Sequence, residues 1–275
     1  MDILISGAST GIGRACSVHL AAKGAIVWAG VRTQKSFDDI LRLNVKGLKP
    51  VFLDVTDSKS IAACVSEVKK KSGTLFGLVN NAGVVIGGPV EGVSMESWRR
   101  QFDVNFFGQI ELTQACLPLI RESKGRILNM SSISGRIASP FLGPYSASKF
   151  ALEAFSDSLR REVRKYGVRV SIIEPGPIKT PIWEKSVSEG ASQKADLSAD
   201  LLSLYGDSLD RFMEEMAKFT TTAAPVSLVV KAVEHALSSH SPKNRYPVGY
   251  GISLVAAISN VVPSDLMDRL IRTKM

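Results

Sequence analysis

Short apolar runs alternate with longer segments of helical periodicity along most of this chain. The runs are rich in Ile, Val and Leu and are too short to form helices of ordinary length. Strands of this kind are buried on both faces, as in a parallel sheet that is covered by helices. The pattern therefore predicts an α/β fold, with a doubly wound parallel sheet of the Rossmann type and helices on both of its faces. The runs lie at residues 3–5, 26–28, 50–53, 78–79, 126–129 and 169–173.

The length and composition fit one domain that spans residues 1–275. The chain is 45% hydrophobic and 22% charged, which suffices for a sizeable core, and no Pro/Gly-rich linker divides it. Residues 181–225 break the alternation, because they add a long segment of mixed polar and apolar helical sequence after the last run. An insertion at this place predicts a helical lid over a ligand site. Its large apolar residues are Trp183, Leu201, Leu202, Tyr205, Phe212, Met213 and Met216.

The charged residues, cysteines and histidines give no sign of a nucleic-acid or metal site. Against 26 Asp and Glu there are 34 Lys and Arg, but the basic clusters at 69–71 and 160–165 lack an aromatic stacking platform. The three cysteines lie about fifty residues apart and the three histidines are scattered, so neither forms a metal-binding pattern. We therefore expect no nucleic-acid partner, no metal, and cysteines that are reduced and buried.

The N-terminal residues carry no signal-peptide pattern. Met1 and Asp2 lead directly into the first apolar run, without a basic region, a long apolar stretch or a cleavage site. A late apolar stretch at 251–262 is far shorter than the roughly 20 residues that span a bilayer. We therefore expect a cytoplasmic protein, in which the late stretch forms a core or interfacial helix.

Three glycines occupy the turn between the first apolar run and the first predicted helix. Their spacing, Gly-x3-Gly-x-Gly, permits a tight turn and lets a pyrophosphate approach the backbone at the helix N-terminus. It differs from the Gly-x-Gly-x2-Gly fingerprint and points to another oxidoreductase family. The candidate cofactor-binding residues of this turn are Gly7, Ser9, Thr10, Gly11, Ile12 and Gly13.

The end of the second run bears on which dinucleotide binds. An acidic residue there bonds the free 2′-hydroxyl of NAD, whereas a basic residue accommodates the 2′-phosphate of NADP. The chain has no carboxylate at this place, and Arg32, helped by Lys35, can pair with a phosphate. We therefore expect NADP(H) as the cofactor, with NAD(H) as the alternative if Arg32 is only a solvated charge.

Two further strand ends carry candidate adenosine contacts. Asp54 ends the third run, where it either accepts from the adenine amino group or caps the following helix. After the fourth run, Asn81, Ala82 and Gly83 let the backbone pass close to the adenosine, and Asn side chains can tie neighbouring strands together.

Tyr145 and Lys149 stand four residues apart at the start of a helical run that extends from 151 to 166. This spacing places both side chains on one face of a helix. A phenol is a poor base at neutral pH, but an adjacent ammonium favours the phenolate. The pair is therefore a candidate for general acid/base catalysis.

Taken together, these motifs resemble the short-chain dehydrogenase/reductase family over nearly the whole chain. The resemblance implies that Tyr145 is the general acid/base and that Ser132 holds the substrate oxygen. It also implies that Lys149 lowers the pKa of Tyr145 and bonds the nicotinamide ribose, and that Asn105 completes a proton relay through water. For Asn105 the alternative is an amide that fills a polar gap within a helix. Hydride transfer between nicotinamide and carbon requires no metal.

A Pro/Gly loop follows the sixth run and resembles the family segment that meets the nicotinamide. The resemblance implies a backbone contact with the carboxamide at Ile178 and a hydroxyl contact with the cofactor at Thr180. A plain chain reversal is the alternative. The candidate cofactor-binding residues of this loop are Pro175, Gly176, Ile178 and Thr180.

The sequences at 155–162, 173–176 and 245–249 resemble the branch that contains retinol, 17β-hydroxysteroid and 3-hydroxybutyrate dehydrogenases. The lid is apolar and the segment 141–144 beside Tyr145 is uncharged, which favours a hydrophobic alcohol or ketone. A small hydroxy acid held by Lys179 or Lys185 is the alternative. Dehydration or epimerisation, and a sensor that binds NADP(H) without turnover, are further alternatives.

The resemblance also implies a homodimer or homotetramer assembled through the helices that contain Asn105 and Tyr145. An apolar set on the second of these helices fits such an interface, although packing within the monomer explains it equally well. A peripheral membrane contact through the C-terminal segment, which is basic at its end, is a further hypothesis. The apolar set is Phe150, Leu152, Ala154, Phe155 and Leu159.

Overall fold

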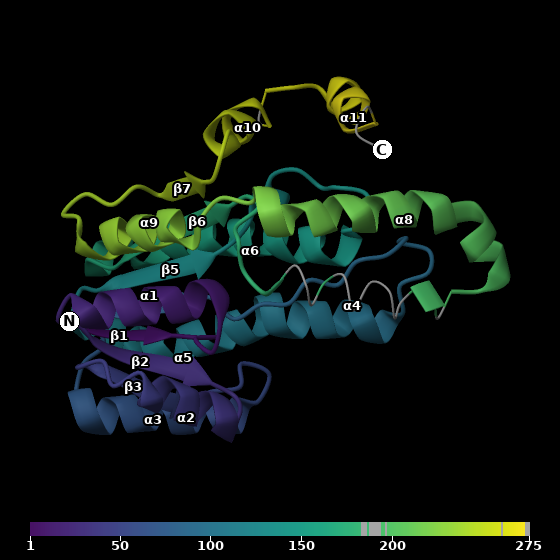
Figure 1. The fold of residues 1–275 in the computed structure, drawn as a ribbon. Coiled ribbons are helices and arrows are strands. Elements are labelled where there is room, and N and C mark those ends of the chain that lie inside the picture. Colours follow the sequence, from purple (N-terminus) through teal and green to yellow (C-terminus); the bar gives the residue numbers. More distant parts are fainter. Residues whose placement is uncertain (183–185, 187–193, 196, 260, 273–275) are drawn as a thin grey trace.

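The computed structural model describes residues 1–182, 186, 194–195, 197–259 and 261–272. Its centre is a parallel seven-stranded sheet in the order β3-β2-β1-β4-β5-β6-β7, with helices on both faces (Figure 1). This architecture confirms the predicted doubly wound α/β fold. The strands are β1 (Asp2–Ile5), β2 (Ile26–Val31), β3 (Leu48–Phe52), β4 (Gly77–Asn80), β5 (Arg126–Met130), β6 (Arg169–Pro175) and β7 (Arg245–Val248).

The order of the strands reverses between β1 and β4, because β2 and β3 lie on one side of β1 and β4 to β7 on the other. In such sheets ligands bind outside the carboxyl ends of the strands at the point of reversal. The helices and single turns are α1 (Gly11–Ala22), α2 (Gln34–Arg42), α3 (Ser58–Ser72), α4 (Met95–Phe102), the π-helical turn η1 (Asp103–Phe107), α5 (Gly108–Glu122), the 3₁₀ turn η2 (Ile133–Gly135), α6 (Gly143–Val163), η3 (Arg164–Tyr166), α8 (Ala199–Thr222), α9 (Val226–Ser238), α10 (Ile252–Ile258) and α11 (Ser264–Arg272).

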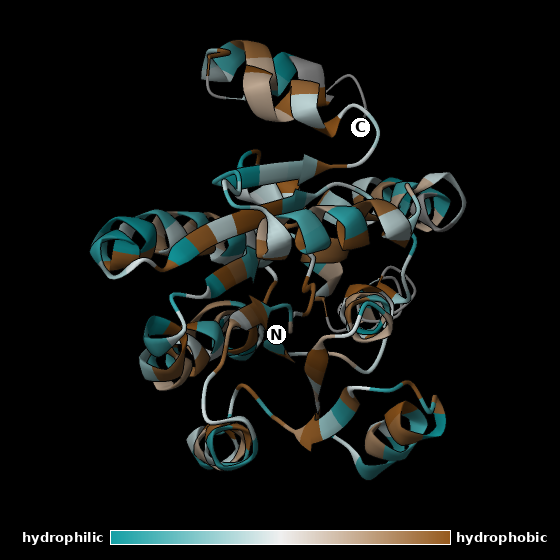
Figure 2. Ribbon diagram, turned by 90° about the vertical axis from the view of Figure 1, so that its left-hand side faces the viewer, coloured by the Kyte–Doolittle hydropathy of each residue, from teal (hydrophilic) through white to brown (hydrophobic). Residues whose placement is uncertain are grey.

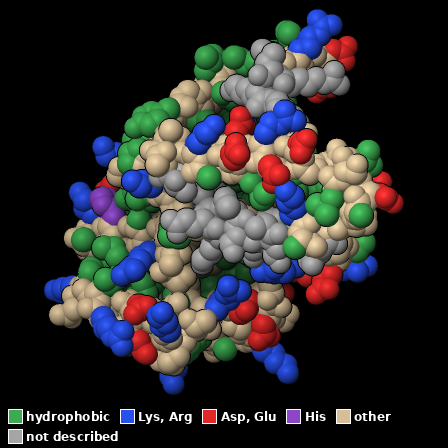
Figure 3. Space-filling model, turned by 45° about the vertical axis from the view of Figure 1, so that its right-hand side comes forward, with side chains coloured by type: hydrophobic (Ala, Val, Ile, Leu, Met, Phe, Trp, Pro, Cys, Tyr) green, Lys and Arg blue, Asp and Glu red, His purple; other side chains and the backbone are tan. Residues whose placement is uncertain are grey.

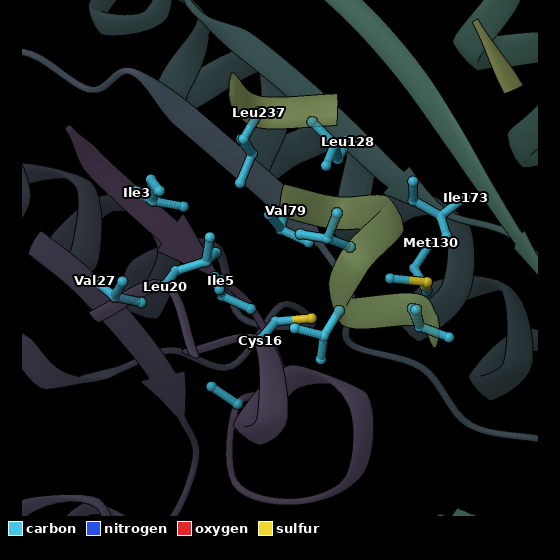
Figure 4. Packing of buried hydrophobic residues seen from close by; sticks show 14 of the residues in the cluster. Ile3, Ile5, Cys16, Leu20, Val27, Val79, Leu128, Met130, Ile173 and Leu237 are labelled. Carbon is cyan, nitrogen blue, oxygen red and sulfur yellow. The ribbon is translucent and has the colours of Figure 1, made fainter. Parts of the chain in front are cut away.

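Two hydrophobic layers enclose the sheet. On one face, side chains of α1 and α9 pack on the strands, and Figure 4 shows Cys16 and Leu20 of α1 directed toward Ile5 and Val79. On the other face, α3, α5 and α6 cover the alternate side chains of the same strands. Burial on both faces explains why the strands appear in the sequence as short apolar runs.

Helix α6 begins at Gly143, with Pro144 in its first turn, and the segment from Tyr145 to Lys149 opens it as predicted. Proline suits this position because the first turn has no partner for its backbone N–H groups. A helix that begins at Gly143 places Tyr145 and Lys149 inside its first two turns.

The seventh strand, β7, is not among the predicted runs. Arg245 and Pro247 interrupt its apolar sequence, yet it pairs in parallel with β6 at the edge of the sheet. Proline is tolerated at an edge because one side of the strand needs no hydrogen bonds. From β7 the chain continues into α10, whose Ile252 packs beside Gly176, and then into α11, which stands away from the body (Figures 1 and 2).

No helix among the described residues is long and apolar enough to cross a membrane. The predicted late helix is present as α10, with Ile252 and Ala256 buried and Leu254 exposed. On the face drawn in Figure 3, Lys and Arg side chains alternate with Asp and Glu side chains over much of the surface.

Candidate active site

The glycine turn after β1 is shaped by close backbone contacts. Gly7 and Gly11 have φ angles of +64° and +54°, which favour glycine. A Cβ atom on Gly7 would lie 2.8 Å from the Cα atom of Ala82, and one on Gly13 would lie 2.3 Å from the carbonyl oxygen of Gly7. The turn therefore depends on glycine at positions where any side chain would collide.

The N-terminus of α1 is open to an anion. Thr10 is the N-cap residue, but its side chain makes no capping hydrogen bond, and the first turn contains no acidic residue. The first backbone N–H groups of a helix lack partners within it and favour a negative charge. Ser9 and Ile12 lie beside these groups, so the predicted phosphate-binding turn has the shape and polarity that a pyrophosphate requires.

Two polar side chains hold this turn against the end of β4. The amide of Asn81 donates to the carbonyl oxygens of Ser6 and Gly7, at 3.0 and 3.1 Å. The hydroxyl of Ser6 in turn accepts from the backbone N–H groups of Asn81 and Ala82, each at 3.0 Å. The sequence predicted that Asn side chains tie neighbouring strands together, as Asn81 does here. It did not predict the role of Ser6, because the sequence shows only a hydroxyl directly after a buried strand.

Arg32 lies where the 2′-phosphate of NADP is expected. It follows β2 directly and is exposed, and Lys35, in the first turn of α2, is exposed beside it in the sequence. The end of β2 is close to the glycine turn, because the Ala8 N–H donates to the carbonyl oxygen of Gly30 at 2.9 Å. The structure thus brings Arg32 to the same edge of the sheet as the predicted pyrophosphate site.

Asp54 does not cap the helix that follows it, which corrects one of its two predicted roles. Its carboxylate accepts from the backbone N–H and hydroxyl of Thr56, at 2.9 and 2.7 Å. The N-cap of α3 is Asp57, which accepts from the N–H of Lys59. A contact between Asp54 and the adenine stays a prediction.

Tyr145, Lys149 and Ser132 meet at the carboxyl end of β5. Ser132 is buried two residues after β5, where its hydroxyl caps η2 by accepting from the N–H of Ser134 at 3.1 Å. The ammonium of Lys149 donates to the carbonyl oxygen of Met130 at 2.8 Å and lies 5.8 Å from the centre of the Tyr145 ring. The structure therefore brings together three of the four side chains that the resemblance implies for catalysis.

Burial changes the acidity of both candidate catalytic groups. Desolvation raises the pKa of Tyr145, and a hydrogen bond with Ser132 opposes this increase. Desolvation also lowers the pKa of Lys149 to about 8, although the nearby carboxylate of Glu153 raises it. The pKa of Tyr145 is thus raised and not lowered as expected, because burial disfavours the phenolate.

Asn105 is fully buried in η1, where its side chain has several hydrogen bonds. Its Oδ1 accepts from the N–H of Val84 at 2.9 Å, and its Nδ2 donates to the carbonyl oxygen of Val84 and to the hydroxyl of Ser148. These contacts tie the chain after Gly83 to α6, one residue before Lys149. They support the polar-gap alternative for the side chain, and the water relay stays a prediction.

The loop after β6 lies against the glycine turn. Gly176 donates to the carbonyl oxygen of Val248, and the N–H of Lys179 donates to Ala224 at the end of the segment that follows. A Cβ atom on Gly11 would lie 3.4 Å from the Cβ atom of Thr180. Ile178 is buried in this loop, so the second predicted cofactor-binding segment, from Pro175 to Thr180, borders the first.

An apolar cavity lies between α8 and the loops that contain Gly87 and Leu142, the latter three residues before Tyr145. Its volume is about 20 Å³, roughly room for one water molecule, so a larger ligand requires α8 to move. The ring of Phe212 on α8 lies 5.5 Å from that of Phe141, whose φ of +61° is strained for a bulky residue. The lining residues are Val85, Gly87, Gly88, Leu142, Ser186, Leu209, Phe212, Met213 and Met216.

Other predicted lid residues have different positions. Tyr205 points to the surface, where its hydroxyl bonds the carboxylate of Glu91 at 2.9 Å. Leu201 lies near Gly92 at the same end of α8. Trp183 and Lys185 lie outside the described residues, and Lys179 is exposed.

The cysteines are buried thiols, as expected. Burial raises the pKa of Cys16 and Cys64 to about 12, and that of Cys116 as well. Among the described part of the chain, no group of three His, Cys, Asp or Glu side chains is arranged to hold a metal ion.

Comparison with known proteins identifies the family to which this arrangement belongs. The model of the family described as short chain dehydrogenase matches residues 2–190, which include the glycine turn, Asn105, Ser132, Tyr145 and Lys149. The chain belongs to the short-chain dehydrogenase family. It is therefore an NAD(P)-dependent oxidoreductase.

Curated short-chain dehydrogenases similar to this one match almost all of its length. Retinol dehydrogenase 5 of Mus musculus is 35% identical over 98% of this chain and 87% of its own. The 17-beta-hydroxysteroid dehydrogenase type 6 of Bos taurus is 36% identical with the same coverage. An NADPH-dependent 3-dehydrocapnine reductase of Ornithobacterium rhinotracheale is 36% identical over 97% of this chain and 94% of its own.

Solved structures of short-chain dehydrogenases share the fold. One from Streptomyces avermitilis has a TM-score of 0.79 at 25% identity, covering 98% of this chain and 94% of its own. One from Burkholderia cenocepacia J2315, in complex with NADP, has a TM-score of 0.74 at 26% identity, covering 98% and 97%.

The cofactor expected of a short-chain dehydrogenase fits the residues described above. The turn requires glycine at Gly7 and Gly13, where a Cβ atom would collide with neighbouring backbone, and the helix N-terminus that follows it is uncapped. Arg32 adds a positive charge at the same edge of the sheet. The predicted tie between neighbouring strands is made by Asn80, whose amide donates to Asn129 across β4 and β5 at 2.9 Å.

Proposed function

We propose that this short-chain dehydrogenase uses NADP(H) to interconvert a hydrophobic, retinoid- or steroid-like alcohol and its carbonyl compound. The observation that carries the proposal is the apolar cavity at Leu142, three residues before Tyr145, which Phe212 and Met216 also line and to which no charged side chain contributes among the described residues. Apolar walls with few polar groups favour a hydrophobic ligand. The names of the similar retinol and hydroxysteroid dehydrogenases support the same substrate class.

In this proposal Tyr145 transfers a proton to or from the substrate oxygen. In this proposal Ser132 holds that oxygen, and its hydrogen bond with Tyr145 supports the assignment. Lys149 provides a positive charge that favours the phenolate of Tyr145 in the transition state and an N–H donor for the nicotinamide ribose. The bound cofactor supplies or accepts the hydride.

The preference for NADP(H) rests on Arg32. Its guanidinium can form two parallel hydrogen bonds with a 2′-phosphate, which a ribose hydroxyl does not offer. A similar reductase is named as NADPH-dependent, and a similar solved structure contains NADP. The other predicted contacts of the cofactor, at Asp54, Asn81, Ala82, Gly83, Gly176, Ile178 and Thr180, are part of this proposal.

We also propose assembly into a homodimer or homotetramer through η1, α5 and α6. Phe107 is 55% exposed and Phe150 43% exposed, whereas Leu152 and Leu159 are buried within the monomer. The predicted apolar set is therefore divided between an exposed part and a core part. Cytoplasmic location and contact with a membrane stay predictions, and sedimentation with anionic vesicles at low salt tests the second.

The proposed function is tested by following nicotinamide absorbance with NADP⁺ and NAD⁺. The substrates are retinol, hydroxysteroids, simple secondary alcohols and 3-hydroxybutyrate, and Tyr145→Phe serves as the blank. We expect turnover of a lipophilic alcohol with NADP⁺ preferred, and loss of at least 100-fold in kcat for the Tyr145→Phe variant. Tyr166→Phe, which removes an exposed hydroxyl, should leave turnover unchanged.

Other outcomes would favour the alternatives. Turnover of 3-hydroxybutyrate with NAD⁺ would contradict both the hydrophobic pocket and the role of Arg32. Cofactor binding without any reaction would favour the sensor or a non-redox reaction.

A further inference from the structure

Five charged side chains from four elements gather behind the catalytic residues. Glu153 and Asp157 lie on α6, Glu174 on β6, Arg245 on β7, and Arg136 directly after η2. Glu174 and Glu153 are only 1% and 7% exposed. Because buried carboxylates are costly unless they are paired, the cluster must be held together by its arginines.

Arg245 is the shared partner of the carboxylates. Its Nε lies 3.2 Å from Glu153 and 3.5 Å from Glu174, and its terminal nitrogen lies 3.0 Å from Asp157. Arg136 binds the same oxygen of Glu174, Oε1, at 2.7 Å. Without Arg245, Glu153 would have no arginine within 4 Å among the described ion pairs, and it would face Glu174.

The side chain of Glu153 reaches η2, the turn that directly follows Ser132. It lies one helical turn after Lys149, on the same face of α6. A Cβ atom on Gly135 would lie 3.1 Å from the Cγ atom of Glu153, 3.2 Å from the carbonyl oxygen of Lys149 and 2.8 Å from the hydroxyl of Ser131. Glu153 is therefore packed beneath the turn that follows Ser132, beside the backbone of Lys149.

The pKa of Glu153 is raised, chiefly by burial, and the charges around it modify this effect. Desolvation raises this pKa most, and a hydrogen bond with Ser131 opposes it. The negative charge of Glu174 raises the pKa further, whereas the positive charges of Arg245 and Arg136 lower it. Glu153 is in turn the carboxylate that raises the pKa of Lys149 against desolvation. Of the other titratable groups near Lys149, Tyr145 is neutral at physiological pH, and Glu174 is bound by two arginines.

We propose that Glu153 and Arg245 form a positioning pair for Lys149. Arg245 keeps Glu153 in its carboxylate form, and this carboxylate keeps the buried lysine charged and directed toward Met130 and Tyr145. The pair acts through Lys149 and touches neither substrate nor cofactor. The proposal rests on the function proposed above for Lys149, and it gives β7, which lies beyond the 2–190 match, a part in the reaction.

The test is the pH dependence of NADPH binding, measured from nicotinamide fluorescence between pH 6.5 and 9.5. In the wild-type protein the affinity should fall as pH rises through the Lys149 pKa of about 8, because a charged donor forms the stronger hydrogen bond. In Glu153→Gln and Arg245→Gln the midpoint should move down by about one pH unit. In Arg245→Lys, which retains the positive charge, the midpoint should lie between that of Arg245→Gln and that of the wild type.

Matched variants distinguish a failure of the role proposed for Lys149 from a failure of the Glu153–Arg245 pair alone. Arg160→Gln removes another arginine that binds Asp157 on α6 and should leave the midpoint unchanged. Lys149→Met should abolish the transition; a transition that persists in this variant would overturn the role of Lys149 and with it the pair. An unchanged midpoint in Glu153→Gln, with Lys149→Met behaving as expected, would overturn the pair alone.

Variants that retain charge keep the test decisive if the glutamine variants do not fold. Glu153→Asp withdraws the carboxylate by one methylene from Lys149 and should shift the midpoint by a smaller amount in the same direction. A midpoint identical to that of the wild type in both Glu153→Asp and Arg245→Lys would contradict the proposal.

Discussion

The ammonium of Lys149 donates a hydrogen bond of 2.8 Å to the carbonyl oxygen of Met130, the last residue of β5. This bond joins the second turn of α6 to the strand that leads into Ser132. The buried amine thus fixes the helix that carries Tyr145 relative to the turn that carries Ser132. Because this arrangement desolvates a positive charge, it stabilises the geometry of the site but reduces the stability of the protein.

Lys149→Met should therefore stabilise the protein at neutral pH. Burial lowers the pKa of Lys149 from its usual 10.5 to about 8, so between these pH values the unfolded chain binds a proton that the folded protein does not. Wild-type stability must then rise with pH across this window, and below pH 8 the buried charge costs about 3 kcal/mol. After the loss of the bond to Met130, which costs about 1 kcal/mol, the variant should gain on the order of 2 kcal/mol at pH 7.

Urea unfolding at pH 7 and pH 10 measures this difference. The gain should shrink at pH 10, where the amine of the wild type is neutral in the folded protein. A variant that is destabilised equally at both pH values would show that packing, and not charge, dominates at Lys149.

Gly13→Ala should disrupt the cofactor-binding turn. The added methyl group would lie 2.3 Å from the carbonyl oxygen of Gly7 and 2.5 Å from the amide of Asn81. Neither group can move away without breaking the hydrogen bond between them. We expect a loss of about 1–3 kcal/mol in stability and weaker NADPH binding. Gly206→Ala is the control, because Gly206 lies within α8 with no atom near its Cβ position and should gain up to about 1 kcal/mol. Equal melting temperatures for the two variants would contradict the collision.

Arg32→Gln should reduce the preference for NADPH over NADH. Hydrogen bonds to a charged phosphate contribute about 1.5–3 kcal/mol, which corresponds to a roughly 10- to 100-fold loss in NADPH affinity. The affinity for NADH, which lacks the phosphate, should change little. Fluorescence titration with both cofactors measures the ratio, and Arg42→Gln, which removes an exposed arginine at the end of α2, is the control. If the affinities for both cofactors fall equally, Arg32 does not read the phosphate.

The fold was predictable because its strands are buried on both faces and its helices on one. Each buried strand leaves a short apolar run, and the glycine turn is readable because φ angles near +60° at Gly7 and Gly11 favour one residue type. Strand β7 escaped prediction because Pro247 and Arg245 are tolerated at a sheet edge.

The candidate catalytic residues were predictable from spacing, but the cluster behind them was not. Tyr145 and Lys149 are neighbours on one helix, so their contact follows from the helical repeat. Arg136, Glu174 and Arg245 come together only through the order of β5, β6 and β7, and no local pattern encodes which carboxylate meets which arginine. The same limitation applies to Asp54, since only the backbone shows that Asp57 caps α3 instead.

Phe212→Ala should distinguish a lid that contacts substrate from a helix that merely covers the site. The ring of Phe212 lies against Phe141 in the apolar cavity, so its removal should reduce contact with a large hydrophobic substrate. We expect kcat/KM for retinol or a hydroxysteroid to fall by about 10- to 100-fold, the range expected for the loss of apolar contacts in a pocket. The value for a small secondary alcohol, which does not reach α8, should stay within a few-fold of the wild type.

Two further measurements show whether the effect on α8 is specific. NADPH affinity should not change in Phe212→Ala, because the glycine turn and Arg32 lie at the other side of the site. Tyr205→Phe, which removes only the surface bond to Glu91, should leave both substrates unaffected. An equal fall in kcat/KM for the small and the large alcohol would show that α8 supports the segment 141–144 that leads to Tyr145. The hydrophobic substrate must then bind elsewhere.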